Sequence, residues 1–60
     1  MADADIINNM AEKIATIKSA ALELRALAGT GFPAVEKNTD RILASVKMLE
    51  LNVTDVVGLA

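Results

Sequence analysis

The feature that most constrains this chain is the segment Gly29-Thr30-Gly31-Phe32-Pro33, a single break between two long amphipathic stretches. On each side of it, apolar or small residues recur at alternating intervals of three and four. These seam positions are Ile7, Met10, Ile14, Ile17, Ala21, Leu24 and Ala28, then Val35, Thr39, Ile42, Val46, Leu49, Val53 and Val56. This heptad pattern is typical of helices packed side by side at small crossing angles. The sequence therefore predicts an all-α fold, a coiled-coil-like antiparallel hairpin of two helices.

Folding the second seam back on the first places Ile17 opposite Val46 and Ile14 opposite Leu49. These four residues are predicted to form the most buried layers. Any two continuous heptads can be matched in this way. The informative point is that the fold axis lies within the only Gly-Pro cluster of the chain.

The break itself has the composition of a helix-to-helix turn. Gly29 can take the left-handed conformation that ends a helix, and Pro33 suits the first turn of the next one. Thr30 or Gly31 is expected to cap that second helix. We expect one domain over residues 1–60, with a helix over about 4–28, a turn over 29–33 and a helix over about 33–57.

Three positions leave alternatives open. Phe32, the only aromatic residue, is expected to plug the open end of the hairpin, or else to anchor a partner. Thr39 is expected to return its hydroxyl to a backbone carbonyl one turn back, or to form a polar layer that fixes register or oligomeric state. The second helix either continues to Val57 or breaks at Asn52, with Thr54 capping a final turn.

The length and the missing residue types point to self-association. A lone domain of 60 residues is marginal unless a disulfide, a metal or oligomerisation helps it. The chain has no Cys and no His, so a disulfide is impossible and a transition-metal site is disfavoured. Apolar residues make up 53% of the chain, more than one two-helix seam can hide.

The charge pattern disfavours several partners. The net charge is −2, and acids and bases are nearly balanced in each half, so nucleic acid is an unfavoured partner. The acidic N-terminus lacks the basic start and apolar core of a signal peptide. No uncharged apolar run approaches the ~20 residues that cross a bilayer. We therefore expect a cytoplasmic protein with no membrane association.

The sequence contains no catalytic pattern, no cofactor-binding pattern and no convincing metal site. Triads of the Ser-His or Cys-His type need residues that the chain lacks. The short Gly29-Thr30-Gly31 stretch has no adjacent Lys and is explained by the turn rather than by a phosphate cradle. Asp3 and Asp5 suit a helix start better than a metal site, because nothing near them supplies further oxygen ligands. We therefore expect no enzyme activity.

The favoured function is a small structural or interaction protein, an oligomeric helical bundle that acts as a scaffold or accessory subunit for a protein partner. The alternative is a small nucleic-acid-binding regulator built as a dimer of hairpins, which rests on architectural analogy alone. A membrane-surface peptide would need a basic polar face that this chain does not have.

Two sides of the hairpin remain apolar once the seam is satisfied. The first carries Ile6, Ala20, Leu27 and Met48 with three charged residues, and the second carries six charged residues, including a predicted Arg25–Glu36 ion pair. Burying unpaired charge is costly. We therefore expect a homodimer through the first side, which makes a four-helix bundle with twofold symmetry.

Overall fold

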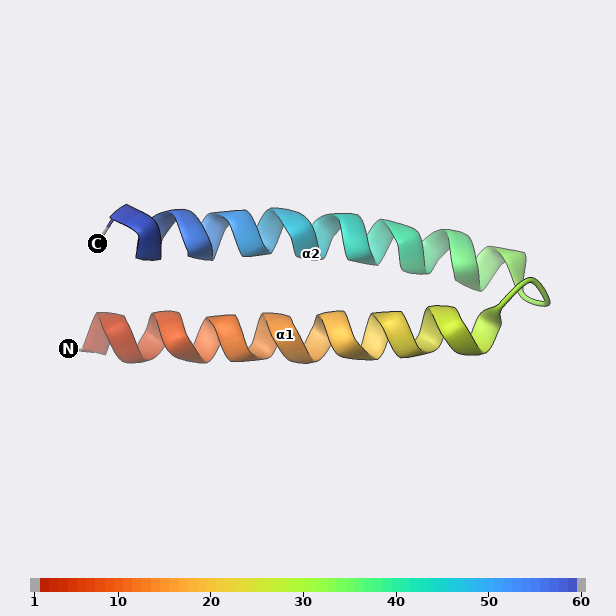
Figure 1. Ribbon diagram of the computed structural model, residues 1–60, viewed down its shortest axis with the longest axis horizontal. Helices are drawn as coiled ribbons and strands as arrows, with labels where there is room; N and C mark the ends of the chain where they lie inside the picture. The colour runs from red at the N-terminus through yellow and green to blue at the C-terminus, as the bar shows by residue number, and fades with distance from the viewer. Residues whose placement is uncertain (1, 60) are drawn as a thin grey trace.

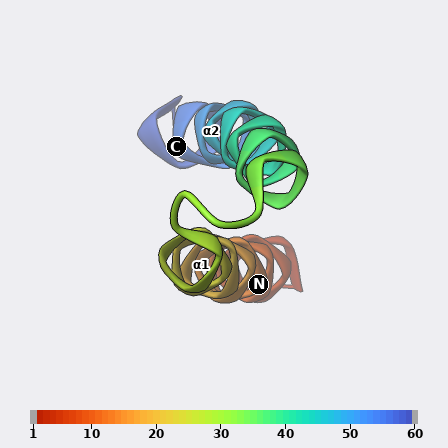
Figure 2. The same ribbon diagram turned by 90° about the vertical axis from the view of Figure 1, so that its right-hand side faces the viewer.

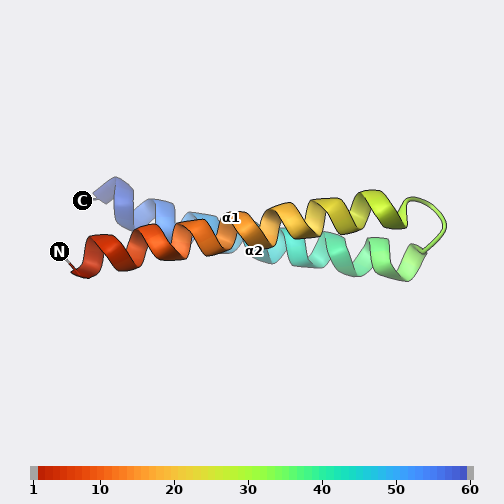
Figure 3. The same cartoon turned by 90° about the horizontal axis from the view of Figure 1, so that it is seen from below.

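The computed structural model describes the backbone of residues 2–59 and the side chains of residues 3–53. Two helices, α1 (Ala2–Ala28) and α2 (Pro33–Leu59), lie antiparallel and side by side, joined by one short loop (Figures 1 and 3). The Cα atoms span 46 × 15 × 11 Å, so the molecule is a long, thin two-helix layer. The predicted all-α hairpin is confirmed.

The turn begins with a glycine that ends α1. Gly29 has a φ of 51°, and its N–H donates to the carbonyl of Arg25 at 3.1 Å. This is the left-handed cap in which the residue after the helix closes the last turn. The Gly31 N–H then donates to the Ala28 carbonyl at 3.2 Å, and the loop carries the chain across to α2 (Figure 2).

The start of α2 differs from the prediction. The Glu36 N–H donates to the carbonyl of Phe32 at 3.0 Å, which makes Phe32 the N-cap residue and Pro33 the first helical residue. Capping by Thr30 or Gly31 is therefore wrong. Pro33 explains the shift, because proline at the first helical position loses no hydrogen bond and fixes the cap one residue before it.

Phe32 does not plug the open end of the hairpin, and that prediction is also wrong. As the N-cap, it lies in the loop with 63% of its surface exposed. Its ring instead borders a shallow depression with Leu24, Leu27, Ala28 and Val35 at the turn end.

The seam divides into a buried stripe and a half-exposed stripe. The buried stripe consists of Ile14, Ala21 and Ala28 on α1 and Thr39 and Val46 on α2. The half-exposed stripe consists of Met10, Ile17, Leu24, Ile42 and Leu49, which are between 41% and 44% exposed, and the remaining described heptad positions, Ile7, Val35 and Val53, are less exposed. Val56 lies outside the residues whose side chains are described.

The predicted core layers are therefore half right. Val46 and Ile14 are buried, but Ile17 and Leu49 are not. The reason is the rotation of each helix about its own axis, which points one row of its seam at the facing helix. The second row of each seam turns toward one side of the hairpin.

Thr39 is the most buried described side chain, at 1% exposed. Its Oγ1 donates to the carbonyl of Val35 at 2.6 Å, one turn back, as expected. The hydroxyl is thereby satisfied within its own helix, which lets a polar residue occupy the most buried of the described positions.

The backbone of α2 continues through Asn52 to Leu59. The break at Asn52 that the sequence left open does not occur. Val53 is half-buried and lines a groove with Met10 and Ile14 of α1, whereas the side chains of Val56 and Val57 lie outside the described residues.

Candidate interaction face

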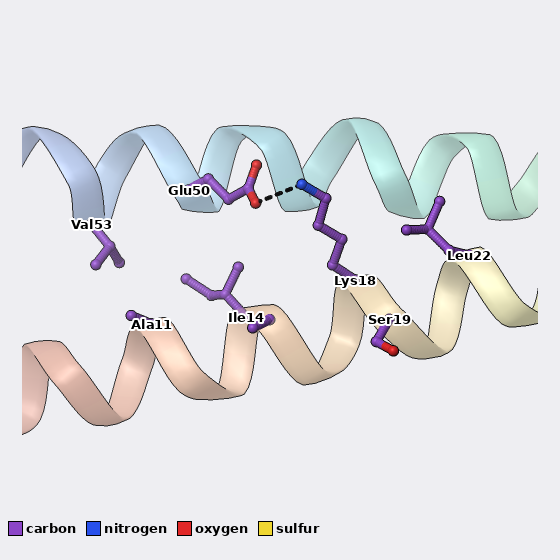
Figure 4. Close-up of a pocket in the computed structure, with 8 residues that line it drawn as sticks. Ala11, Ile14, Lys18, Ser19, Leu22, Glu50 and Val53 are labelled. Carbon is purple, nitrogen blue, oxygen red and sulfur yellow. Dashed lines mark hydrogen bonds and ion pairs between the residues drawn. The ribbon is translucent and has the colours of Figure 1, made fainter.

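Two ion pairs bridge the helices on one side of the hairpin. Lys18 Nζ lies 3.1 Å from Glu50 Oε2, and Arg25 Nε lies 3.0 Å from Asp40 Oδ1. In Figure 4 the Lys18 and Glu50 side chains reach toward each other across the gap between α1 and α2. We call this side the closed face.

The predicted Arg25–Glu36 pair is replaced by Arg25–Asp40. Helical side chains lean toward the N-terminus of their own helix. In an antiparallel pair, Arg25 and Glu36 therefore lean apart, whereas Arg25 and Asp40 lean together. The Lys18–Glu50 pair obeys the same rule.

The closed face also contains a shallow groove of about 470 Å³. Small side chains, Ala11, Ala15 and Ser19, form part of its lining, and the Lys18–Glu50 pair crosses it (Figure 4). Among the described residues, no three Asp or Glu side chains converge as metal ligands. The groove is thus a polar-edged depression between two helices.

The opposite side, which we call the open face, is lined by apolar side chains from both helices. It is made of the half-exposed stripe and, on each helix, of the residues that lie three or four positions from that stripe on the same side. It consists of Ile6, Met10, Lys13, Ile17, Ala20, Leu24 and Leu27 on α1 and Val35, Asn38, Ile42, Ser45, Leu49 and Asn52 on α2. Lys13 is the one charged residue in this set.

Three shallow grooves follow one another along the open face. The first lies at the terminal end, between Met10 and Leu49, with a volume of about 510 Å³. The second surrounds Ile42 near Ile17 and Ala20. The third lies at the turn end, beside Phe32. Together they expose apolar side chains along the length of the hairpin.

The four predicted interface residues are all exposed. Ile6, Ala20 and Leu27 line the three grooves of the open face, and Leu27 is 82% exposed. Met48 lines none of these grooves. It lies one row outside the open face, at its α2 edge.

Sequence reasoning missed the centre of the open face. The heptad spacing predicts that Met10, Ile17, Leu24, Ile42 and Leu49 belong to the hairpin core, yet each leaves more than two-fifths of its surface exposed. The signal that could have found them is numerical. Apolar residues make up 53% of the chain, more than one two-helix seam can hide.

Comparison with known protein families, with characterised proteins and with solved structures gives no match. Within the described residues, neither helix combines the length and apolar character needed to cross a membrane.

Proposed function

We propose that this chain is a small structural or interaction protein whose open face takes a second copy, so that two hairpins form a four-helix bundle. The observation that supports this is the half-exposed stripe of five large apolar residues facing one side. A contiguous exposed apolar surface of this kind marks an interaction site. Four-helix bundles bury such rows in their central core.

Energetics support the same proposal. Only five of the described side chains are buried in the single hairpin, and two of them are alanines. Burial of apolar surface contributes roughly 25 cal/mol per Å², so one hairpin gains little. A second copy covers the open face and supplies the missing burial, which is how marginal small domains are commonly stabilised.

The size of the open face also fits. The hairpin layer measures 46 by 15 Å between Cα atoms. A face of that size is comparable to the roughly 800 Å² per partner of a standard stable interface. The assembled bundle then leaves the closed face and the outer residues Ala26, Ala44 and Leu51 for a protein partner, as a scaffold or accessory subunit would.

The test compares two glutamate substitutions matched for exposure. Ile17 on the open face is 44% exposed, and Leu22 on the closed face is 48% exposed. In sedimentation velocity at about 100 μM, roughly a hundred times a micromolar affinity, Ile17→Glu is expected to sediment as a 6.3 kDa monomer. Leu22→Glu is expected to keep the wild-type mass, twice that value. Circular dichroism records whether each variant stays helical.

Two outcomes would overturn the proposal. A wild-type chain that is monomeric and folded at this concentration needs no second copy. A dimer that survives Ile17→Glu but dissociates with Leu22→Glu uses the closed face instead.

A further inference from the structure

Lys13 is the charge that any occupant of the open face has to accommodate. It lies in the same row as Ile6, Ala20 and Leu27, and it lines the terminal groove beside Met10. Glu23 lies ten residues further along α1, one row outside the open face, where it lines a depression with Thr16 and Ala20. The α1 side of the open face therefore carries one base and, at its edge, one acid.

The positions of Lys13 and Glu23 along the hairpin axis can be matched to residues of α2. Ile42 lies among Ile17, Ala21 and Leu24, so it is level with residue 21. Because the helices are antiparallel and rise equally per residue, Ser45 is level with residue 18. Residue 18 is midway between Lys13 and Glu23. Ser45 thus marks the level about which the base and the acid are symmetric.

From this symmetry we infer that the second copy docks on the open face in the antiparallel sense, with the twofold axis at the level of Ser45. This inference rests on the proposed self-association. Each α1 then lies along the partner's α1, and each α2 along the partner's α2. Lys13 is placed level with Glu23 of the partner subunit, and the symmetry repeats this ion pair on the other side of the axis.

The parallel arrangement lacks this complementarity. It would place α1 against α2 of the partner subunit, whose described polar residues on this side are Asn38, Ser45 and Asn52, with Arg41 at the edge. None of these is an acid, so among the described residues of that α2 Lys13 would find no charge partner, and covering it would cost free energy. The antiparallel arrangement pairs Lys13 and leaves Arg41 at the rim, in water.

The side-chain sizes on the open face agree with an axis at this level. On this face Ala20 of α1 lies two residues from level 18, and Ser45 of α2 lies level with it. Small side chains allow two helices to approach closely at that point. In the same register, Asn38 faces Asn52 of the partner subunit, and each amide can both donate and accept a hydrogen bond.

The first experiment reverses the charges one at a time. Lys13→Glu alone and Glu23→Lys alone each place like charges at both symmetric pairs, so each variant is expected to dimerise about tenfold more weakly than the wild type. Mixed together, the two variants should form a heterodimer at wild-type strength, because both pairs become attractive again. If the mixture dimerises no better than either variant alone, the antiparallel arrangement is wrong.

The second experiment uses the absence of cysteine. Ser45→Cys at the axis is expected to form a disulfide-linked dimer on mild oxidation. Asn38→Cys alone is expected to remain unlinked, and to cross-link when mixed with Asn52→Cys. If Ser45→Cys stays unlinked in a solution that sedimentation shows to be dimeric, the orientation is wrong and the proposed function survives. If the protein is monomeric, the proposed function itself fails.

Discussion

The two faces of the hairpin are made by the same pair of helices, yet their edges are built differently. On the closed face, Lys18–Glu50 and Arg25–Asp40 join the helices, and each side chain keeps between 39% and 50% of its surface exposed. Water therefore already solvates the charged groups of the closed face. On the open face, large apolar side chains are left half-covered, and the described residues there form no ion pair between the helices.

The difference shows that the two rows of one heptad seam can serve two different contacts. The row containing Ile14 and Val46 holds the hairpin together, and the row containing Ile17 and Ile42 turns to one side. Exposed ion pairs contribute only about 0–1 kcal/mol each, whereas an apolar row that becomes covered contributes several times that. The closed face therefore guides pairing within the chain, and the open face governs association between chains.

The largest effect is expected in the row that holds the hairpin together. Ile14→Ala removes a buried side chain and should lower the free energy of unfolding by about 2–5 kcal/mol. Urea denaturation at one fixed chain concentration measures this loss. Leu51→Ala, at an outward position that is 48% exposed, serves as the control and should lose much less. Equal losses at the two positions would mean that Ile14 is not part of the core.

Alanine substitutions at Ile17 and Leu22 measure how far the environments of the two faces differ. In a single hairpin the two residues are nearly equally exposed and should cost about 1 kcal/mol each. If a second copy covers the open face, Ile17→Ala should cost about 2 kcal/mol or more, while Leu22→Ala stays near 1 kcal/mol. Denaturation at high chain concentration measures both. Equal stability losses for the two variants at high chain concentration would mean that both faces are equally exposed to solvent.

The turn determines which rows meet, so it affects both faces together. Gly29→Ala forces an L-residue into φ of 51° and should cost about 1–2 kcal/mol. Gly31→Ala is the matched control: a Cβ there meets its nearest atom, the Ala28 carbonyl oxygen, at 3.8 Å. Its φ lies outside the left-handed range. Thermal unfolding should separate the two variants, and equal destabilisation would remove the special role of Gly29.

The smallest effect is expected on the closed face. Lys18→Gln and Asp40→Asn should each lower stability by about 0–1 kcal/mol, and the loss should shrink as salt is added. Neither change should alter the mass of the assembled protein. A dimer that dissociates when these pairs are removed would give the closed face a role in association that this account assigns to the open face.

Much of the fold could be predicted because it depends on local rules. The seam spacing and the Gly29–Pro33 break are sufficient for an antiparallel hairpin, and Gly29 adopts the left-handed cap that its lack of a Cβ allows. The Thr39 hydroxyl bonds one turn back, as its short side chain favours within a helix. These features need only neighbours along the chain or one facing helix.

The remaining features depend on the directions in which side chains point, which the periodicity of the sequence does not determine. The heptad pattern treats Ile14 and Ile17 as equivalent, and only the rotation of each helix about its axis decides which one is buried. The Arg25–Asp40 pair requires the lean of the side chains as well as their level. Phe32 at the N-cap follows from the position of Pro33, which could have been used, but the exposure of its ring depends on the path of the loop.

The most direct test of the account is sedimentation equilibrium of the unmodified chain from about 0.1 to 500 μM, a span that brackets a micromolar affinity. The weight-average mass is expected to rise with concentration and to level at twice the 6.3 kDa chain mass. Helicity by circular dichroism should rise over the same range, because covering the open face stabilises the hairpin. A constant mass of 6.3 kDa with full helicity throughout would contradict the proposed self-association.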